Sequence, residues 1–522
     1  MALTAGVCVP VLAVSLLGGR ACADESPGAP ADDAAPGIDD YPTVEAKVIT
    51  WRREPHGMVA TQARRRVRRL GAVGAACAVL AAGPLAAVAA APAHAAACNS
   101  VDYAVTAECS PPQAQQAKQS RVPRFITDAG AYTGNAVESE NFTVRWGNAV
   151  DVVAWGRQRG YDNYPQWVAN HMEEIWDYYV NDIGWVDPAD HTQGANYRIN
   201  LYLCGSWSGN FLPRANWAGQ DEIGAGHMCL PYDKTWDNWV ESHEFNHILQ
   251  SYASDINAAN GNGGGWGHGN PVAGPVWEAH ANYMARMKRP EVVVGSGYYV
   301  DRQHFRWLAQ ETYYGDWMLF NTIRDTYGPQ VINQFWYEAR RGEHPIDTIK
   351  RVLGLDHQEF AELIGDYASR QVVYDFSDGQ AIRSDLWRGG GAYRPLHTDP
   401  LQSQGGGLYR IASSDAPHQY GHNIFRLNPT GGQVSVQLQG QSTLSGADWR
   451  FQLVAVRSDF SVRYSGLFAP GQTANFSLQS GETHLMLVVA ATPSQHRNYT
   501  MWQVGVGDPF PYQLTITGAT PS

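Results

Sequence analysis

The chain has 522 residues, of which 38 are Lys or Arg and 50 are Asp or Glu, so its formal net charge is −12. A hydrophobic content of 44% is enough to build ordinary cores and excludes a wholly disordered chain. The acidic balance argues against nucleic-acid binding as the main role, because phosphate recognition needs a basic face, and the length suggests about two to four domains.

The first 95 residues predict export. Residues 64–69 read Arg-Arg-Arg-Val-Arg-Arg, an apolar run follows over 70–91, and Ala93-His94-Ala95 forms an A-x-A site. This order is typical of a secretory signal peptide, which we place at 58–95. An uncleaved anchor is the alternative, because about 22 apolar residues can just span a bilayer. Residues 1–57 are then a mis-set start or a disordered leader.

No stretch after residue 95 is long and apolar enough to span a bilayer. We therefore expect a secreted, extracellular protein that has no membrane contact after signal cleavage. We also expect a monomer that does not bind nucleic acid.

Four cysteines follow the signal peptide: Cys98, Cys109, Cys204 and Cys229. An even number in an exported chain indicates disulfides, and three pairings are possible. We expect the pairs Cys98–Cys109 and Cys204–Cys229, because each closes a short local loop. None of these cysteines has C-x-x-C spacing, so we expect structural bridges rather than metal ligands.

The predicted elements begin with a polar linker over 96–120, which is rich in Gln and Ala. Period-two alternation predicts strands at Asn141–Trp146, Arg198–Leu203 and Gly224–Leu230. Helical spacing of apolar residues predicts helices at Tyr164–Val180, Trp236–Tyr252 and Pro275–Met287. Asn260–Gly274 is a glycine-rich loop, and residues 302–375 read as a succession of helices.

Helical periodicity ends near residue 385. Short alternating runs then follow, separated by Gly, Asn, Asp and Ser clusters: Leu408–Ile411, Val434–Leu438, Trp449–Val456, His484–Val489 and Tyr512–Thr517. This pattern is typical of an antiparallel β-sandwich. We therefore predict an α+β protein, with a catalytic domain of mixed sheet and active-site helices over 121–385 and a β-sandwich domain over 386–522.

The residues that carry chemistry lie between positions 243 and 282. His243-Glu244-Phe245-Asn246-His247 is an H-E-x-x-H motif. On a helix the two histidines, four residues apart, share one face, so both imidazoles can bind a single Zn²⁺. Glu244 then lies beside the open position of the metal, where it can take a proton from a bound water as general base.

Zinc needs a third protein ligand. Residues 248–253 read Ile-Leu-Gln-Ser-Tyr-Ala, which excludes the H-x-x-G-x-x-H route. The next predicted helix carries Glu278, 31 residues after His247, and also His280. Two residues apart on a helix, these side chains point about 200° away from each other, so they cannot both face one metal. We favour Glu278 as the ligand and keep His280 as the alternative.

H-E-x-x-H followed by a downstream helical Glu resembles the gluzincin pattern of thermolysin-like zinc peptidases. In that pattern an acidic or amide residue four positions after the Glu supports the first His, and Asn282 occupies this position. Asn can accept from an imidazole N–H but lacks the charge of Asp, so polarisation of the ligand is weaker.

The runs His-Glu-Phe-x-His-x-Leu-Gln and Trp-Glu-x-His-Ala-Asn-Tyr also resemble an uncharacterised family of secreted bacterial and fungal zincins. The resemblance covers residues 139–370. It implies a zincin-like catalytic domain with a zinc hydrolase activity, and it indicates no substrate.

Gluzincins usually have a Tyr or His that stabilises the oxyanion of the tetrahedral intermediate. The downstream candidates are Tyr283, His304, Tyr313 and Tyr314. We select Tyr314, because it precedes Gly-Asp-Trp at a predicted helix start.

These features predict a secreted zinc metallopeptidase that hydrolyses peptide bonds of a protein or glycoprotein with a zinc-activated water. The substrate is expected to bind extended along an edge strand near Cys204–Leu230. One alternative is a glycoprotein- or glycan-targeting hydrolase whose β-sandwich binds carbohydrate through surface Trp and Tyr. The other is a non-catalytic adhesion protein stabilised by zinc, against which the intact Glu244 argues, because zinc binding alone does not need that carboxylate.

Overall fold

The computed structural model describes residues 118–124, 135–209, 211–234, 236, 238–267, 270, 272–292, 299–386, 398–499 and 507–522. These residues belong to one compact unit. The predicted signal peptide and the pair Cys98–Cys109 lie outside the described residues. Of the helices in the described ranges, none has the length and apolar composition needed to cross a bilayer.

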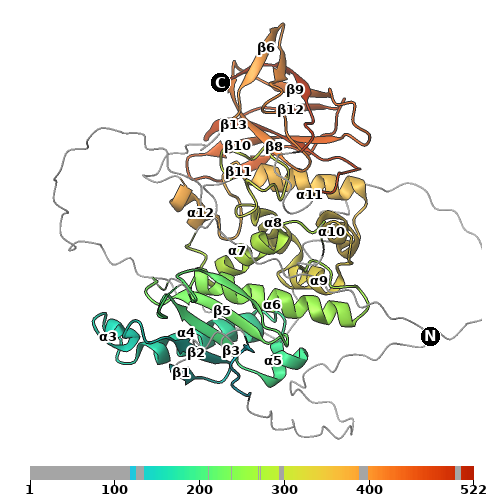
Figure 1. Ribbon diagram of the computed structural model, residues 1–522. Helices are drawn as coiled ribbons and strands as arrows, with labels where there is room; N and C mark the ends of the chain where they lie inside the picture. Colours follow the sequence, from blue (N-terminus) through green and yellow to red (C-terminus); the bar gives the residue numbers. More distant parts are fainter. Residues whose placement is uncertain are drawn as a thin grey trace, which may run out of the picture. The chain divides into compact units, whose positions relative to one another are not determined.

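A five-stranded mixed sheet with the order β1-β2-β3-β5-β4 forms the N-terminal part of this unit (Figure 1). Its strands are β1 Asn135–Glu138, β2 Phe142–Trp146, β3 Ile199–Cys204, β4 Trp217–Gln220 and β5 Gly226–Pro231. The strands β2, β3 and β5 are parallel, and β1 and β4 are antiparallel at the two edges. The predicted mixed sheet is therefore confirmed.

The disulfide between Cys204 and Cys229 is also confirmed. It joins the neighbouring strands β3 and β5, with the two Cα atoms 5.7 Å apart. Both cysteines are fully buried, in a small cluster with Tyr202 and Trp207. The bridge thus fixes the part of the sheet that lies next to the edge strand β4.

The three helices predicted at 164–180, 236–252 and 275–287 are present with shifted ends, whereas the short helices at 152–157 and 192–196 were not predicted. The metal motif lies on α6 Val240–Ala259, and the downstream Glu lies on α7 Val276–Lys288. The remaining helices are α3 Val152–Arg157, α4 Tyr164–Asp177, α5 Thr192–Asn196, α8 Met318–Tyr327, α9 Gln330–Glu338, α10 Pro345–Leu353, α11 His357–Arg370 and α12 Gly379–Leu386. A π-helical segment, η1 Tyr178–Asp182, and a 3₁₀ helix, η2 Pro188–Asp190, complete the set.

Helix α6 differs from its predicted bounds, Trp236–Tyr252, at both ends. It starts only at Val240, because Asn238 has a φ of 63° and interrupts a helix. It continues past Tyr252 because Asn257 donates hydrogen bonds to the carbonyls of Trp336 and Ala339, at 3.1 and 2.8 Å. This extension depends on contacts with α9, which the local sequence does not contain.

Helix α6 packs directly on strands β4 and β5. The close approach depends on Gly226 at the start of β5. A Cβ atom there would lie 2.6 Å from Cγ2 of Ile248 and 2.9 Å from the hydroxyl of Tyr252. The backbone N–H of Gly226 also donates to that hydroxyl at 2.8 Å. The helix with the H-E-x-x-H motif is thereby held against the sheet beside its edge strand.

The predicted helical stretch 302–375 begins only at Met318, so this expectation was wrong for residues 302–317, which form turns. The buried carboxylate of Asp316 accepts hydrogen bonds from the backbone N–H of Leu308 at 2.7 Å and from the hydroxyl of Thr312 at 3.1 Å. These side-chain hydrogen bonds take the place of the backbone hydrogen bonds that a helix over 302–317 would make. Burial raises the pKa of Asp316 to about 7, against the opposing effect of these hydrogen bonds.

The C-terminal part is an antiparallel β-sandwich, as predicted. Its two five-stranded sheets have the orders β11-β10-β13-β8-β15 and β12-β9-β14-β7-β6 (Figure 1). The strands are β6 Leu401–Gly405, β7 Leu408–Ile411, β8 His422–Pro429, β9 Val434–Gly440, β10 Trp449–Arg457, β11 Val462–Tyr464, β12 Thr473–Phe476, β13 Glu482–Ala491, β14 Tyr512–Thr517 and β15 Ala519–Pro521. Strands β6, β8, β11, β12 and β15 were not predicted.

The first of these sheets is buried on both faces. Leu453 and Leu487 belong to the core between the two sheets, whereas Val454 and Val488 belong to the larger core of the helical part. Helix α11 packs on β10 and β13. The sandwich therefore shares a hydrophobic core with the helices that precede it.

Surface aromatic rings were the predicted basis for carbohydrate binding by the sandwich. Within residues 398–499 and 507–522, no large hydrophobic side chain is exposed. Trp502 lies outside the described residues. The carbohydrate-binding interpretation stays a prediction.

Candidate metal centre

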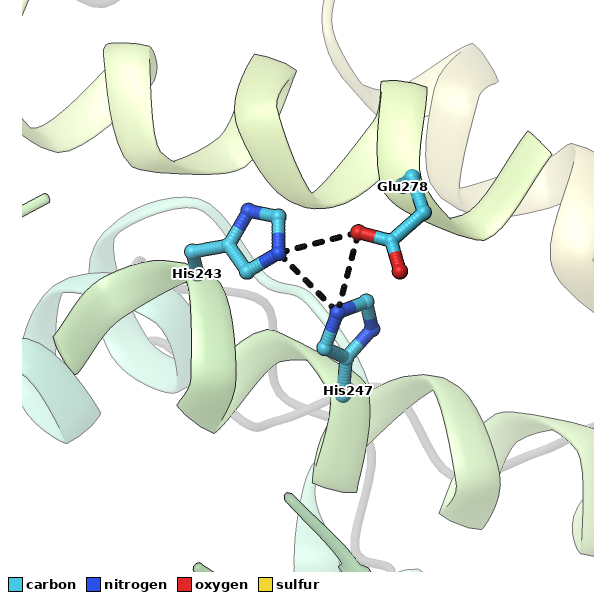
Figure 2. Close-up of side chains that lie close together, drawn as sticks. All are labelled: His243, His247 and Glu278. Atoms are coloured by element: carbon cyan, nitrogen blue, oxygen red, sulfur yellow. Dashed lines mark hydrogen bonds and ion pairs between the residues drawn. The ribbon is translucent and has the colours of Figure 1, made fainter. Parts of the chain in front are cut away.

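Helices α6 and α7 pack against each other and direct three side chains to one point (Figure 2). His243 and His247 come from successive turns of α6, and Glu278 comes from the first turn of α7. The two Nε2 atoms lie 3.1 Å apart, and Oε2 of Glu278 lies 3.1 Å from Nε2 of His243 and 3.5 Å from Nε2 of His247. One ligand atom from each residue falls within 4.8 Å of the others, so this group can hold a metal ion.

The electrostatics of this cluster favour a positive charge at its centre. Burial raises the pKa of the Glu278 carboxyl, but hydrogen bonds from His243 and His247 outweigh burial, so the net shift is downward. Burial lowers the pKa of His247, but the hydrogen bond and charge of Glu278 outweigh it, so the net shift is upward. A cation between the three ligand atoms would take the place of the proton that these shifts favour.

Asn282 determines which nitrogen of His243 faces the cluster. Its Nδ2 donates to the backbone carbonyl of Tyr314 at 2.8 Å, and a carbonyl can only accept. Its Oδ1 therefore faces Nδ1 of His243, at 2.7 Å, and accepts the proton there. Without a metal, Nε2 of His243 carries the proton that it donates to Glu278; when a metal takes the place of this proton, the lone pair of His243 is on Nε2.

Gln250 has the same role for His247, and the sequence analysis missed it. Its Nε2 donates to the carbonyl of Trp277 at 2.9 Å, so its Oε1 accepts from Nδ1 of His247 at 2.8 Å. Its position three residues after His247 was a usable signal, because residues i and i+3 are neighbours on a helix. Nδ1 of both candidate ligands is thus held as a donor to a neutral carboxamide, so loss of the Nε2 proton leaves the lone pair of each ring on Nε2.

Glu244 follows His243 on α6 and is only 8% exposed. Burial raises the pKa of its carboxyl; the charges of His243 and His247 oppose this shift, and the charge of Glu278 adds to it. The net shift is upward, toward the range in which a carboxylate works as a general base near neutral pH.

Of the four residues considered for the oxyanion, Tyr314 lies beside the cluster. Its ring centroid is 6.3 Å from that of His243, and the ring of Tyr313 packs on it at 4.4 Å. Burial raises the pKa of Tyr314, and the charge of Glu278 adds to the rise, so its hydroxyl stays protonated. Tyr283 instead packs on Phe320 with a centroid distance of 5.7 Å, and His304 packs on Phe305 at 4.8 Å.

His280, the alternative ligand, faces away from the cluster. Its ring is fully buried, with its centroid 5.1 Å from that of Trp336 and 5.2 Å from that of Trp185. Burial lowers the pKa of His280 to about 3, and the charge of His247 adds to this shift. His280 is therefore a neutral side chain of the interior and is not part of the ligand group.

The model of a family of unknown function, DUF6055, matches residues 110–522. No curated protein matches the chain. Among solved structures, the chain is 11% identical to accessory secretory protein 1, 2 and 3 of Streptococcus pneumoniae, over 24% of this chain and 92% of that chain, with a TM-score of 0.14.

The chain is also 11% identical to the M60 catalytic domain of Clostridium perfringens ZmpC, solved in complex with the sialyl T antigen. This match covers 71% of the present chain and 69% of that chain, with a TM-score of 0.24. Both TM-scores are too low for either similarity to bear on function.

Proposed function

Because this chain belongs to the DUF6055 family, whose function is unknown, we propose its activity from its own site: the protein is a secreted zinc metallopeptidase. The observation that carries the proposal is the convergence of His243, His247 and Glu278 within 4.8 Å, from two packed helices. Secretion rests on the predicted signal peptide at 58–95.

The donor set fits zinc. Two imidazole nitrogens and one carboxylate oxygen are typical of catalytic zinc sites, which keep a fourth position open. The hydrogen bonds of Asn282 and Gln250 leave both Nε2 lone pairs free for a metal. When bound there, Zn²⁺ supplies Lewis-acid chemistry, lowering the pKa of water and polarising a carbonyl oxygen.

Glu244 is the proposed general base. Its carboxylate takes a proton from the water that attacks the peptide carbonyl carbon, and it then gives this proton to the amide nitrogen as the C–N bond breaks. Its burial, with 8% of its surface exposed, supports this role, because a carboxylate in a water-poor site has a raised pKa.

Tyr314 is the proposed donor to the oxyanion of the tetrahedral intermediate. Its ring lies next to His243, and its hydroxyl keeps its proton because burial raises its pKa. The backbone of Tyr314 is tied to the site through Asn282. These contacts support a hydroxyl that is preorganised to donate where negative charge develops.

Strand β4 supports a protein substrate. It lies at the edge of the five-stranded sheet, its four residues are all half-buried, and it packs on α6. An extended peptide can add to such an edge through main-chain hydrogen bonds, which fixes the peptide carbonyl without demanding particular side chains. We therefore propose that the substrate lies along β4, an edge strand within the span Cys204–Leu230 near which the substrate was expected.

Incubation of the purified protein with a proteome-derived peptide library tests this proposal, with cleavage read by mass spectrometry. We expect cleavage by the zinc-loaded protein, none after treatment with a chelator, and recovery when zinc is added back. Cleavage that persists after complete removal of the metal would contradict a zinc peptidase. Tight zinc binding without cleavage of any peptide would instead favour the zinc-stabilised adhesion protein.

A further inference from the structure

The imidazole of His280 faces away from the metal ligands, yet it contacts two side chains of the metal-binding helix. Its Nδ1 lies 3.0 Å from Nε2 of Gln250 and 3.3 Å from Nδ2 of Asn246. Asn246 and Gln250 are four residues apart on α6, so they share a face next to the one that carries His243 and His247. Packing among aromatic rings does not account for these two contacts.

The partners of the two amides determine the direction of both hydrogen bonds. Gln250 donates to the carbonyl of Trp277, and Asn246 accepts through Oδ1 from the indole N–H of Trp185 at 2.9 Å. A carbonyl only accepts and an indole N–H only donates, so both amides turn their NH₂ groups toward His280. Nδ1 of His280 must therefore be an acceptor, which requires its proton to be on Nε2, a buried atom that has no hydrogen-bond partner among the described residues.

The opposite end of Gln250 contacts the metal ligand, with Oε1 2.8 Å from Nδ1 of His247. If the amide of Gln250 were reversed, its NH₂ group would face the Nδ1 proton of His247. Its oxygen would then face the lone pairs of His280 and of the Trp277 carbonyl. All of these atoms are buried, so the reversed amide would leave unpaired polar groups in the interior.

We propose that His280 is a positioning residue for His247. By accepting from Gln250, it holds the carbonyl oxygen of that amide toward Nδ1 of His247, and so keeps the lone pair of His247 on Nε2, toward the metal. This role rests on the proposed function, because it presumes that His247 is a metal ligand. The proposed role accounts for the presence of His280 among aromatic side chains beside α6.

Two variants separate the acceptor from the packing of the ring. His280→Asn keeps an oxygen acceptor near the position of Nδ1 but loses most of the ring. His280→Phe keeps a ring among Trp185, Phe320 and Trp336 but has no acceptor. We expect His280→Phe to lose zinc affinity by about tenfold with a small change in stability. We expect His280→Asn to bind zinc like the wild type but to unfold at a lower temperature.

Zinc competition against a chelator of known affinity, together with thermal unfolding, measures both quantities on the purified protein. If His280→Asn lost as much zinc affinity as His280→Phe, the contribution of His280 would be packing and the proposal would be overturned. Wild-type zinc affinity in His280→Phe would overturn it as well. Failure of the wild type itself to bind zinc would overturn the proposed function.

A double-mutant cycle with Gln250→Leu tests the route through which His280 acts. Gln250→Leu removes the hydrogen-bonded route from His280 to His247. We therefore expect His280→Phe to cause no further loss of zinc affinity in the Gln250→Leu background. Additive losses would show that His280 acts independently of Gln250, which would contradict the proposal.

Discussion

Helix α6, which carries His243 and His247, and the core between the two sheets of the β-sandwich bury different kinds of side chain. Helix α6 buries a run of polar residues: Ser242, His243, Glu244, Asn246, His247 and Gln250. Strand β13 buries aliphatic residues instead, with Leu485, Leu487 and Val489 between the sheets and Met486 and Val488 toward the helices. Buried polar groups are costly unless they are paired, whereas buried apolar surface stabilises in proportion to its area.

This contrast indicates where stability and chemistry reside. The imidazoles and amides of α6 are matched to partners on α7, as in the bonds from His243 to Asn282 and from Gln250 to the Trp277 carbonyl. Such pairing fixes the orientation of the imidazole rings, whereas packing in an apolar core does not require paired polar groups. A change in one region should therefore leave the characteristic property of the other region intact.

The largest expected effect is on catalysis, from Glu244→Gln. The amide cannot take a proton from water, so we expect peptide hydrolysis to fall by about 10²–10⁴-fold, while zinc affinity stays at the wild-type level because Glu244 is not a ligand. Initial cleavage rates and zinc competition titrations measure the two quantities. The control is Glu174→Gln, at a carboxylate that is 73% exposed on α4. Full activity in Glu244→Gln would refute the general-base assignment.

The next effect is on stability, from Leu487→Ala. This side chain is fully buried between the two sheets, so its truncation removes apolar contacts and leaves a cavity. We expect a loss of about 2–5 kcal/mol in the free energy of unfolding and no change in zinc affinity. Denaturant unfolding would show it, with exposed Gln437→Ala on β9 as the control. A parallel loss of zinc affinity would mean that the two regions are not separable.

Asn282→Ala should have an intermediate effect on the metal centre alone. It removes the acceptor for Nδ1 of His243, and we expect zinc affinity to fall by about 10–100-fold. Asn282→Asp keeps an acceptor for His243 and adds a negative charge. In the wild type the Tyr314 carbonyl accepts from the NH₂ group of Asn282, whereas in this variant a carboxylate oxygen would face that carbonyl. We therefore expect Asn282→Asp to bind zinc but to cleave peptides more slowly. Wild-type zinc affinity in Asn282→Ala would argue against this role.

The smallest effect concerns Asp316, in the turns that carry Tyr314. Burial raises its pKa to about 7 in the folded protein, so the folded state holds a proton that the unfolded state releases near its ordinary value of 3.8. Its contribution to stability is therefore present at low pH and is lost as the pH rises through about 7. We expect the wild type to lose roughly 1 kcal/mol relative to Asp316→Asn between pH 6 and pH 8.

Denaturant unfolding of both proteins at these pH values tests the prediction. Asp316→Asn keeps an oxygen acceptor for Leu308 and Thr312 and has no titrating group. A difference in stability between the two proteins that is constant with pH would mean that Asp316 does not titrate in this range.

Much of the candidate site follows from local rules of the sequence. Helical periodicity places His243 with His247 and Glu278 with Asn282, since each pair is four residues apart. The same periodicity placed His280 on the opposite side from Glu278. The support of His247 by Gln250 was missed, because the orientation of that amide depends on the carbonyl of Trp277, which comes from another helix.

The errors in the fold have similar causes. Strand β4 has only four residues and is half-buried throughout, so it shows no alternating pattern. Residues 302–317 have apolar residues at helical spacing, but the carboxylate of Asp316 takes the backbone N–H of Leu308 and stabilises turns. Strand β8 is buried over its first four residues, His422–Phe425, and lacks a clear period of two. In each case tertiary contacts outweigh the local preference.

The zinc content of the purified protein, compared with Glu278→Ala and Glu174→Ala, tests the central claim most directly. Each protein is stripped with a chelator, reconstituted with zinc, freed of unbound metal and measured by elemental analysis. We predict one zinc per chain for the wild type and for Glu174→Ala, and almost none for folded Glu278→Ala, because a direct ligand is lost. Full zinc occupancy in Glu278→Ala, or no zinc in the wild type, would contradict a metal centre built from His243, His247 and Glu278.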